Sequence, residues 1–374
     1  MTAAIWSPGG LNGVTRVWAL PGPVWAGARD TIFTSPFAAD GSRLVAGVGA
    51  RGGAMLAWNT EDLDRPPAVM PELKPQGDDS FSGASAVSAD GNLAVSGTGG
   101  GGAYLWDLSD PASPRIYGEP AVYVKGIVAV VALNPAGDLL AVSSQDDNSI
   151  ALVDVSDPSA PKLLSSTDVG SYPQMMAFQP GTDILAIANA KNEVDLWDVS
   201  NAASPPRVAA TVGGFESYAL AVSFSADGTL LAAGSADHGV AVWDVRTPSA
   251  PEELARLVGP PEGAIYSISF NRAGDRLAAG VGDGTVWLWD IETPSQATRF
   301  ATLSAYPGRV NDAQFAGESD MIAGSGSDKT VRLWGGIDPD GVVDRLCRTA
   351  GSPITEAEWE RYLPGVPYQD PCAG

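Results

Sequence analysis

Residues 218–245 read YALAVSFSADGTLLAAGSADHGVAVWDV, and their pattern indicates the fold class. Two runs of alternating apolar residues flank the turn at 225–228, and a third run follows a short loop and ends in Trp243 and Asp244. Apolar alternation with a period of two is typical of β-strands, and small residues with Asp and Gly supply tight turns. The stretch therefore predicts three antiparallel strands joined by a turn and a loop.

The same unit recurs along the chain at a nearly constant spacing. Its third strand ends at Trp58, Trp106, Val153, Trp197, Trp243, Trp289 and Trp334, in steps of 44 to 48 residues, and a partial copy ends at Trp18. A turn such as Ala-Asp-Gly precedes the second strand, and Asp-Pro or Thr-Pro precedes a fourth, variable strand. A constant period of this length indicates one supersecondary unit that is copied seven times.

In its period, its turn and its Trp-Asp dipeptide, this repeat resembles the WD-repeat β-propeller family. The resemblance implies an all-β fold, a seven-bladed β-propeller of four-stranded antiparallel blades over residues 21–336. Residues 1–20 resemble the end of a further blade. Family propellers commonly close the ring with an N-terminal strand, so either PGPVW (21–25) or VTRVWAL (14–20) is expected to do so. The family's Gly-His dipeptide is absent, because the chain has one histidine, so the blades must rely more on apolar packing.

Residues 337–374 are predicted to form a short α-helical tail that docks on the propeller as a clasp. Asp338 fits the N-cap of a first helix that ends at Gly351, and Thr355 with Glu358 forms the capping box of a second. The tail is similar to the C-terminal ends of bacterial multidomain WD-repeat proteins, in which a helix-turn-helix domain or a STAND-type ATPase precedes the propeller. This similarity implies the sensor or docking half of a larger regulator, with further chain upstream.

Composition narrows the classes of partner. The chain has 44 Asp and Glu against 22 Lys and Arg, a formal charge of -22 at pH 7. Nucleic-acid binding is not expected, because neutralising phosphates requires clustered basic residues. Direct membrane insertion is not expected either, because no apolar run approaches the roughly 20 residues that span a bilayer. We expect a monomeric propeller within a larger chain, in a cytoplasmic or an extracytoplasmic location.

No cofactor, metal or catalytic site is expected. Gly97, Gly99 and Gly102 form a G-x-G-x-x-G pattern, but a strand is predicted next, so the loop is interpreted as structural rather than dinucleotide-binding. His238 stands alone in a turn and is expected to be exposed. QDDNS (145–149) lacks the alternating oxygen ligands of a calcium loop. A carboxylate pair in acid-base chemistry stays open, although most Asp residues occupy repeat positions.

Two functions are therefore considered. The first is a non-catalytic propeller, a sensor or scaffold that binds a protein or peptide on one face of the ring. The second is a propeller enzyme, a hydrolase or lyase that works through carboxylates in the central funnel. The first is favoured, because it requires no feature that the sequence lacks.

The predicted binding face is the end of the ring at which each innermost strand begins. Aligning the seven first strands on the apolar residue before the turn places a different residue four positions earlier in each: Phe33, Gly83, Ala129, Gln174, Leu220, Tyr266 and Asn311. A structural role would demand one residue type, so the variation indicates a surface free to specialise. The predicted interaction residues are Phe33, Gln174, Leu220, Tyr266 and Asn311, joined by Tyr172, Tyr218 and Arg309 two positions further upstream.

Cys347 and Cys372 are predicted to form a disulfide if the domain works outside the reducing cytosol. They are the two cysteines of the chain, they bracket a segment too small to hold itself, and closing this loop is worth about 3 to 4 kcal/mol in the chain-entropy model. Two buried free thiols are the alternative. Mass spectrometry after alkylation of the unfolded, unreduced protein should find neither cysteine modified, and two alkylated thiols would contradict a covalent clasp.

Overall fold

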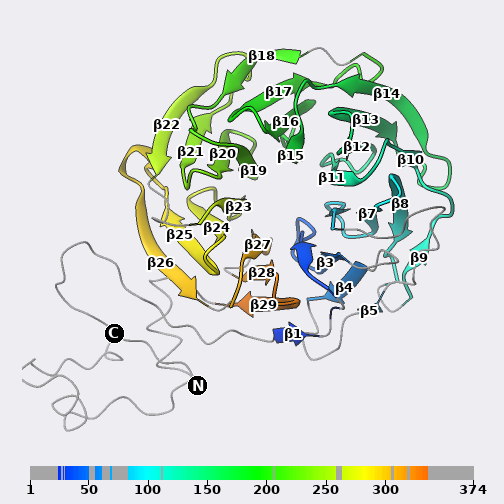
Figure 1. Ribbon diagram of the computed structural model, residues 1–374, viewed down its shortest axis with the longest axis horizontal. Coiled ribbons are helices and arrows are strands. Elements are labelled where there is room, and N and C mark those ends of the chain that lie inside the picture. The colour runs from blue at the N-terminus through cyan, green and yellow to red at the C-terminus, as the bar shows by residue number, and fades with distance from the viewer. Residues whose placement is uncertain are drawn as a thin grey trace, which may run out of the picture.

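The structure is a ring of seven antiparallel β-sheets (Figure 1). This computed structural model describes residues 24–26, 28, 30–49, 55–60, 68–69, 83–110, 113–204, 207–257, 263–304, 307–317 and 321–335. Over these residues the one helical element is a short 3-10 turn, η1 (Pro294–Gln296). The predicted all-β, seven-bladed propeller of four-stranded blades is confirmed. The predicted helical tail and both cysteines lie outside the described residues.

Blades 1 to 3 follow the chain, and the innermost strand is given first in each. Blade 1 holds β2 (Ile32–Thr34), β3 (Arg43–Val48), β4 (Met55–Asn59) and β5 (Ala68–Val69). Blade 2 holds β6 (Ser85–Val87), β7 (Leu93–Gly97) and β8 (Gly102–Asp107), and β8 pairs outward with both β9 (Arg115–Ile116) and β10 (Val122–Tyr123). Blade 3 holds β11 (Val128–Leu133), β12 (Leu139–Ser144), β13 (Ser149–Asp154) and β14 (Lys162–Asp168).

Blades 4 to 6 repeat this order without interruption. Blade 4 holds β15 (Pro173–Phe178), β16 (Ile184–Asn189), β17 (Val194–Asp198) and β18 (Arg207–Val212). Blade 5 holds β19 (Ala219–Phe224), β20 (Leu230–Ser235), β21 (Val240–Asp244) and β22 (Glu252–Leu257). Blade 6 holds β23 (Ile265–Phe270), β24 (Arg276–Val281), β25 (Thr285–Asp290) and β26 (Thr298–Ser304).

Blade 7 joins the two ends of the described chain. Its inner strands are β27 (Val310–Phe315), β28 (Ile322–Gly326) and β29 (Thr330–Trp334), and its outer strand is β1 (Val24–Ala26). Trp25 lies opposite Val331 in the antiparallel ladder and stacks on Trp58 of blade 1, with ring centroids 4.8 Å apart. The PGPVW segment, rather than VTRVWAL, therefore supplies the closing strand.

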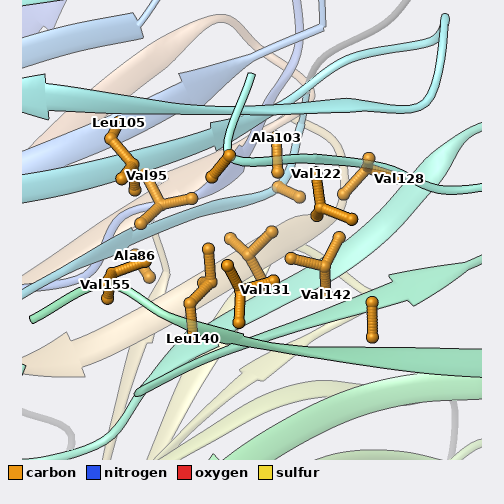
Figure 2. Close-up of a cluster of buried hydrophobic side chains, with 14 of the residues drawn as sticks. Ala86, Val95, Ala103, Leu105, Val122, Val128, Val131, Leu140, Val142 and Val155 are labelled. Carbon is orange, nitrogen blue, oxygen red and sulfur yellow. The ribbon is translucent and has the colours of Figure 1, made fainter. Parts of the chain in front are cut away.

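The apolar core lies between the blades. Figure 2 shows Val95 and Leu105 of blade 2 packed against Val131, Leu140 and their neighbours from blade 3. Each such side chain is buried, and full burial is worth roughly 1.5 to 3 kcal/mol relative to exposure. The third-strand tryptophans also follow this pattern, since Trp106 packs with Val45 of blade 1. The ring is thus held by burial between consecutive sheets, as the missing Gly-His dipeptide led us to expect.

The hydrogen bonding of the indole N–H of these tryptophans differs from blade to blade. The Trp106 indole N–H donates to the Ser96 hydroxyl at 3.0 Å. The same position of the second strand is Ala46 in blade 1 and Ile187 in blade 4, as the strand registers show. Among the described residues, the buried indole N–H groups of Trp58 and Trp197 have no acceptor. An unpaired buried donor costs stability, so packing alone holds these two side chains.

Ser96→Ala is expected to lower the free energy of unfolding by about 1 to 2 kcal/mol, because it leaves the buried Trp106 N–H unpaired. Urea denaturation of Ser96→Ala, Trp106→Phe and the double variant forms a cycle that isolates the hydrogen bond. In the Trp106→Phe background, the Ser96→Ala change should cost about 1 kcal/mol less. Equal costs in both backgrounds would show that this bond does not stabilise blade 2.

Candidate functional site

The predicted interaction residues lie at one end of the ring, here called the upper face. At this end each innermost strand begins beside the hairpin that joins the second and third strands of its own blade. The carbonyl of Tyr172 accepts the Ala190 N–H at 3.2 Å, and that of Tyr218 accepts the Ala236 N–H at 2.9 Å. Backbone hydrogen bonds of this kind tie the start of these innermost strands to the adjacent hairpin.

A β-bulge explains why one position varies between blades. In six blades the register between the first and second strands shifts by one residue near the start of the first strand. In five of them the residue that the strand register skips is Phe33, Gln174, Leu220, Tyr266 or Asn311. An extra residue in one strand is released from the ladder and its side chain is re-aimed. The variable position of the alignment is therefore the bulge residue in these five blades, which the sequence did not reveal.

Three tyrosines lie on the upper face of three consecutive blades. Tyr172, Tyr218 and Tyr266 belong to blades 4, 5 and 6, and with Arg309 of blade 7 we call them the tyrosine arc. The Arg309 guanidinium lies over the Tyr266 ring, 4.5 Å from its centroid, and links blades 6 and 7. Tyr218 is 51% exposed, whereas Tyr172 is half-buried and burial raises the pKa of its phenol. The bulge residues Gln174 of blade 4 and Leu220 of blade 5 are half-buried.

Phe33 and Asn311 connect neighbouring blades. A Cβ atom at Gly83 would lie only 2.7 Å from the Phe33 ring, so the glycine makes room for that ring at the start of blade 2. Asn311 is buried, and its side-chain amide donates to the Ile32 carbonyl of blade 1 at 2.6 Å. These two bulge residues therefore contribute contacts within the ring, whereas Tyr218 of blade 5 is exposed.

Asp312, which the sequence reasoning did not select, is a buried carboxylate beside Asn311. Its side chain is 3% exposed, and it accepts the Ser35 N–H of blade 1 at 2.6 Å and the Gln314 amide of its own strand at 2.8 Å. The Ser35 hydroxyl donates to the same carboxylate at 3.3 Å. Burial raises the pKa of Asp312 despite these hydrogen bonds. The sequence contained one signal for this residue: Asp312 is an acid at the strand position that holds Ala221 in blade 5.

The isolated motifs have structural roles. Thr98 accepts the Gly102 N–H at 3.0 Å within the tight connection between β7 and β8, so the glycine-rich loop is a hairpin as predicted. His238 lies in a turn, but the expectation that it is exposed was wrong, because it is half-buried with φ +73° and its buried Nδ1 has no partner among the described residues. In the QDDNS turn, Asp147 accepts the Ser149 N–H at 3.2 Å.

Among the described residues, no group of three or more His, Cys, Asp and Glu side chains is arranged to hold a metal ion. None of the helical structure in that part of the chain is long and apolar enough to cross a membrane.

The fold and its upper face define a seven-bladed propeller with a variable ring of bulge residues. Residues 208–244, 251–290 and 298–335 match the family model "WD domain, G-beta repeat", and residues 143–169 match the LVIVD repeat. Each of the three WD matches runs from the outer strand of one blade to the third strand of the next. The protein is therefore a WD-repeat seven-bladed β-propeller. A comparison with curated protein sequences found no match.

Asp312→Asn is expected to change how stability depends on pH. A carboxyl whose folded-state pKa lies above its usual value of 3.8 favours folding most at low pH, and this contribution is lost as the pH rises through the folded pKa. The variant does not titrate at this position. Its free energy of unfolding relative to the unmodified protein should therefore increase between about pH 4.5 and about pH 8 in urea denaturation.

Asp154→Asn provides a control of opposite sign. Hydrogen bonds from the Ser156 side chain and backbone lower the pKa of the Asp154 carboxyl, so its stabilising effect is retained as the pH rises. The relative stability of this variant should not increase over the same pH range. Parallel pH profiles for Asp312→Asn and the unmodified protein would contradict the assignment.

Proposed function

We propose that the protein is a non-catalytic interaction scaffold that binds a protein or peptide partner on its upper face. The observation that carries this proposal is the bulge, which places a different side chain at the same position of blades 4 to 7. A frame that is constant while one position varies is suited to recognition. The Tyr218 side chain is 51% exposed, which the fold itself does not require. Aromatic side chains with a polar tip are enriched at binding hot spots.

The surroundings of the tyrosine arc support a partner that offers hydrogen bonds as well as apolar contact. Tyr266 and Arg309 form a stacked pair whose planar guanidinium can still donate at its edge. Leu220 adds an aliphatic side chain between the tyrosines of blades 5 and 6. A peptide lying across blades 4 to 7 would therefore meet alternating aromatic and polar groups, the composition usual at the centre of protein interfaces.

We further propose that the propeller serves as the sensor or docking part of a larger bacterial signalling regulator. This part of the proposal is supported by the similarity of residues 337–374 to the ends of such proteins, and that segment lies outside the described residues. A candidate group for the enzyme alternative among the described residues is Asp312, whose raised pKa would suit an acid. Its burial and its hydrogen bonds to Ser35 and Gln314 favour a structural role instead.

Peptide selection tests the proposed face. Peptides are selected from a random display library on the immobilised propeller, and their affinities are then measured for Tyr218→Ala/Tyr266→Ala and for Tyr117→Ala/Tyr123→Ala. The second pair is the control, because Tyr123 is also 51% exposed but lies on the outer edge of blade 2. We expect the first pair to weaken binding by about tenfold or more, as the loss of interface anchors does. Equal affinities for both pairs, with unchanged thermal melts, would contradict binding at the tyrosine arc.

A further inference from the structure

A groove of about 600 Å³ lies between blades 5 and 6 at the lower face, the end of the ring opposite the tyrosine arc. Its walls are the turns at 227–230 and 273–275, the end of β21, the outer strand β22, and the segment that leads into η1. The volume falls within the range of about 300 to 1,000 Å³ that is common for binding sites. Because the groove is open to solvent, it suits an extended segment better than an enclosed small molecule.

The floor of the groove is apolar. Leu230, Leu254, Ile291 and Pro294 line it, and Ile291 is 1% exposed. Leu254 is released from the ladder by a register shift between β21 and β22, because Trp243 pairs with Glu253 and Val242 pairs with Ala255. An extra residue of this kind leaves the regular alternation of the strand, and here it lines the crevice toward blade 6. The groove thus offers an aliphatic side chain a place to be buried.

Larger side chains occupy the position that corresponds to Leu254 in blades 2 and 6. It is Tyr117 in blade 2 and Phe300 in blade 6, where the Arg276 guanidinium lies 5.7 Å from the Phe300 ring centroid. In blade 3 it is Leu164, but the next residue, Ser165, donates a hydrogen bond to the Ala202 carbonyl of the following blade. Leu254 is smaller than either aromatic residue, which leaves room at the junction of blades 5 and 6.

The rim of the groove is acidic. Asp227, Asp244, Asp275 and Glu292 line it together with one basic residue, Arg246. Four carboxylates and one guanidinium leave a formal charge of -3. The Arg246 side chain, 72% exposed, donates to Asp244 at 2.9 Å, and this hydrogen bond lowers the pKa of the Asp244 carboxyl. The rim therefore remains anionic at neutral pH and attracts cations.

We propose that this groove is a second docking site, which binds an extended peptide segment with basic side chains on either side of an aliphatic one. The aliphatic side chain would lie on Leu230 and Leu254, and Lys or Arg side chains would pair with Asp275 and Glu292 at the rim. Charge complementarity selects this partner, since the chain carries a net charge of -22, which repels nucleic acids and anionic lipid surfaces. The site is on the opposite face from the tyrosine arc and does not depend on the function proposed for it.

The probe is a fluorescein-labelled peptide of alternating Arg and Leu, about eight residues long, which in extended form at about 3.3 Å per residue reaches across the groove. Fluorescence anisotropy should show binding that weakens with added salt, because rim charges contribute. Replacing every Leu of the probe by Ser should weaken binding by about tenfold, because the apolar contact is lost. Failure of the Arg-Leu peptide to bind, or equal binding of the Arg-Ser peptide, would overturn the proposal.

Matched variants locate the site. Leu254→Phe should fill the groove as Phe300 fills the next position and weaken binding by about tenfold, whereas Leu164→Phe at the same position of blade 3 should leave it unchanged. Glu292→Lys should weaken binding by about fivefold, and Glu119→Lys, an exposed site on blade 2 with the same change in net charge, should not.

Thermal melts check that each variant is folded, and the Glu292→Lys pair keeps the test decisive if Leu254→Phe is unstable. Equal effects of the matched variants would place the peptide elsewhere and overturn the proposal. Tyr218→Ala should not change the affinity for this probe, so the outcome at the lower groove is separate from the outcome at the upper face.

Discussion

Burial of apolar side chains between neighbouring blades holds the ring together. A four-stranded sheet cannot cover both of its own faces, so each blade is stable only when another blade lies on either side. The clusters around Leu140 and around Leu231 each draw residues from two consecutive blades. A closed ring satisfies every blade in this way, and an open one would leave two apolar faces in water. The pairing of β1 with β29 makes closure possible, since it joins the last blade to the start of the chain.

Hydrogen bonds are concentrated where the ring closes. Around blade 7 and blade 1, side chains of one innermost strand bond to the next: Ser267 accepts the Ala313 N–H, Asp312 accepts the Ser35 N–H, and Thr34 donates to the Gly83 carbonyl. The same position is apolar in blades 2 to 5, where it is Ala84, Val130, Met175 and Ala221. Apolar burial is not directional, whereas a hydrogen bond requires defined geometry. The polar contacts therefore set the alignment of blades that come from opposite ends of the chain.

The two faces of the ring differ in how they can specialise. On the upper face, the bulge releases one residue of the innermost strand from the ladder in six blades, so its identity can vary without disturbing the sheet. On the lower face, the turns repeat Asp residues that accept hydrogen bonds from their own backbone, as Asp227 does from Thr229. On this face the variable position is the bulge of the outer strand. Leu254 leaves a groove beside blade 5, whereas Phe300 fills the corresponding place beside blade 6. One repeat thus supports two kinds of variable surface on a constant core.

The number of blades, the order of their strands and the variable position on the upper face could be predicted from the sequence, because period, alternation and turn residues are local properties. The sequence could not choose between PGPVW and VTRVWAL as the closing strand, since both read as strands and the partner strand lies some 300 residues away. The tertiary structure decided that choice, and it also placed Asn311 and Asp312 against blade 1 and opened the groove beside Leu254. Each of these features depends on which side chains meet across a blade junction. Such contacts exist only where blades pack against one another, and no local pattern records them.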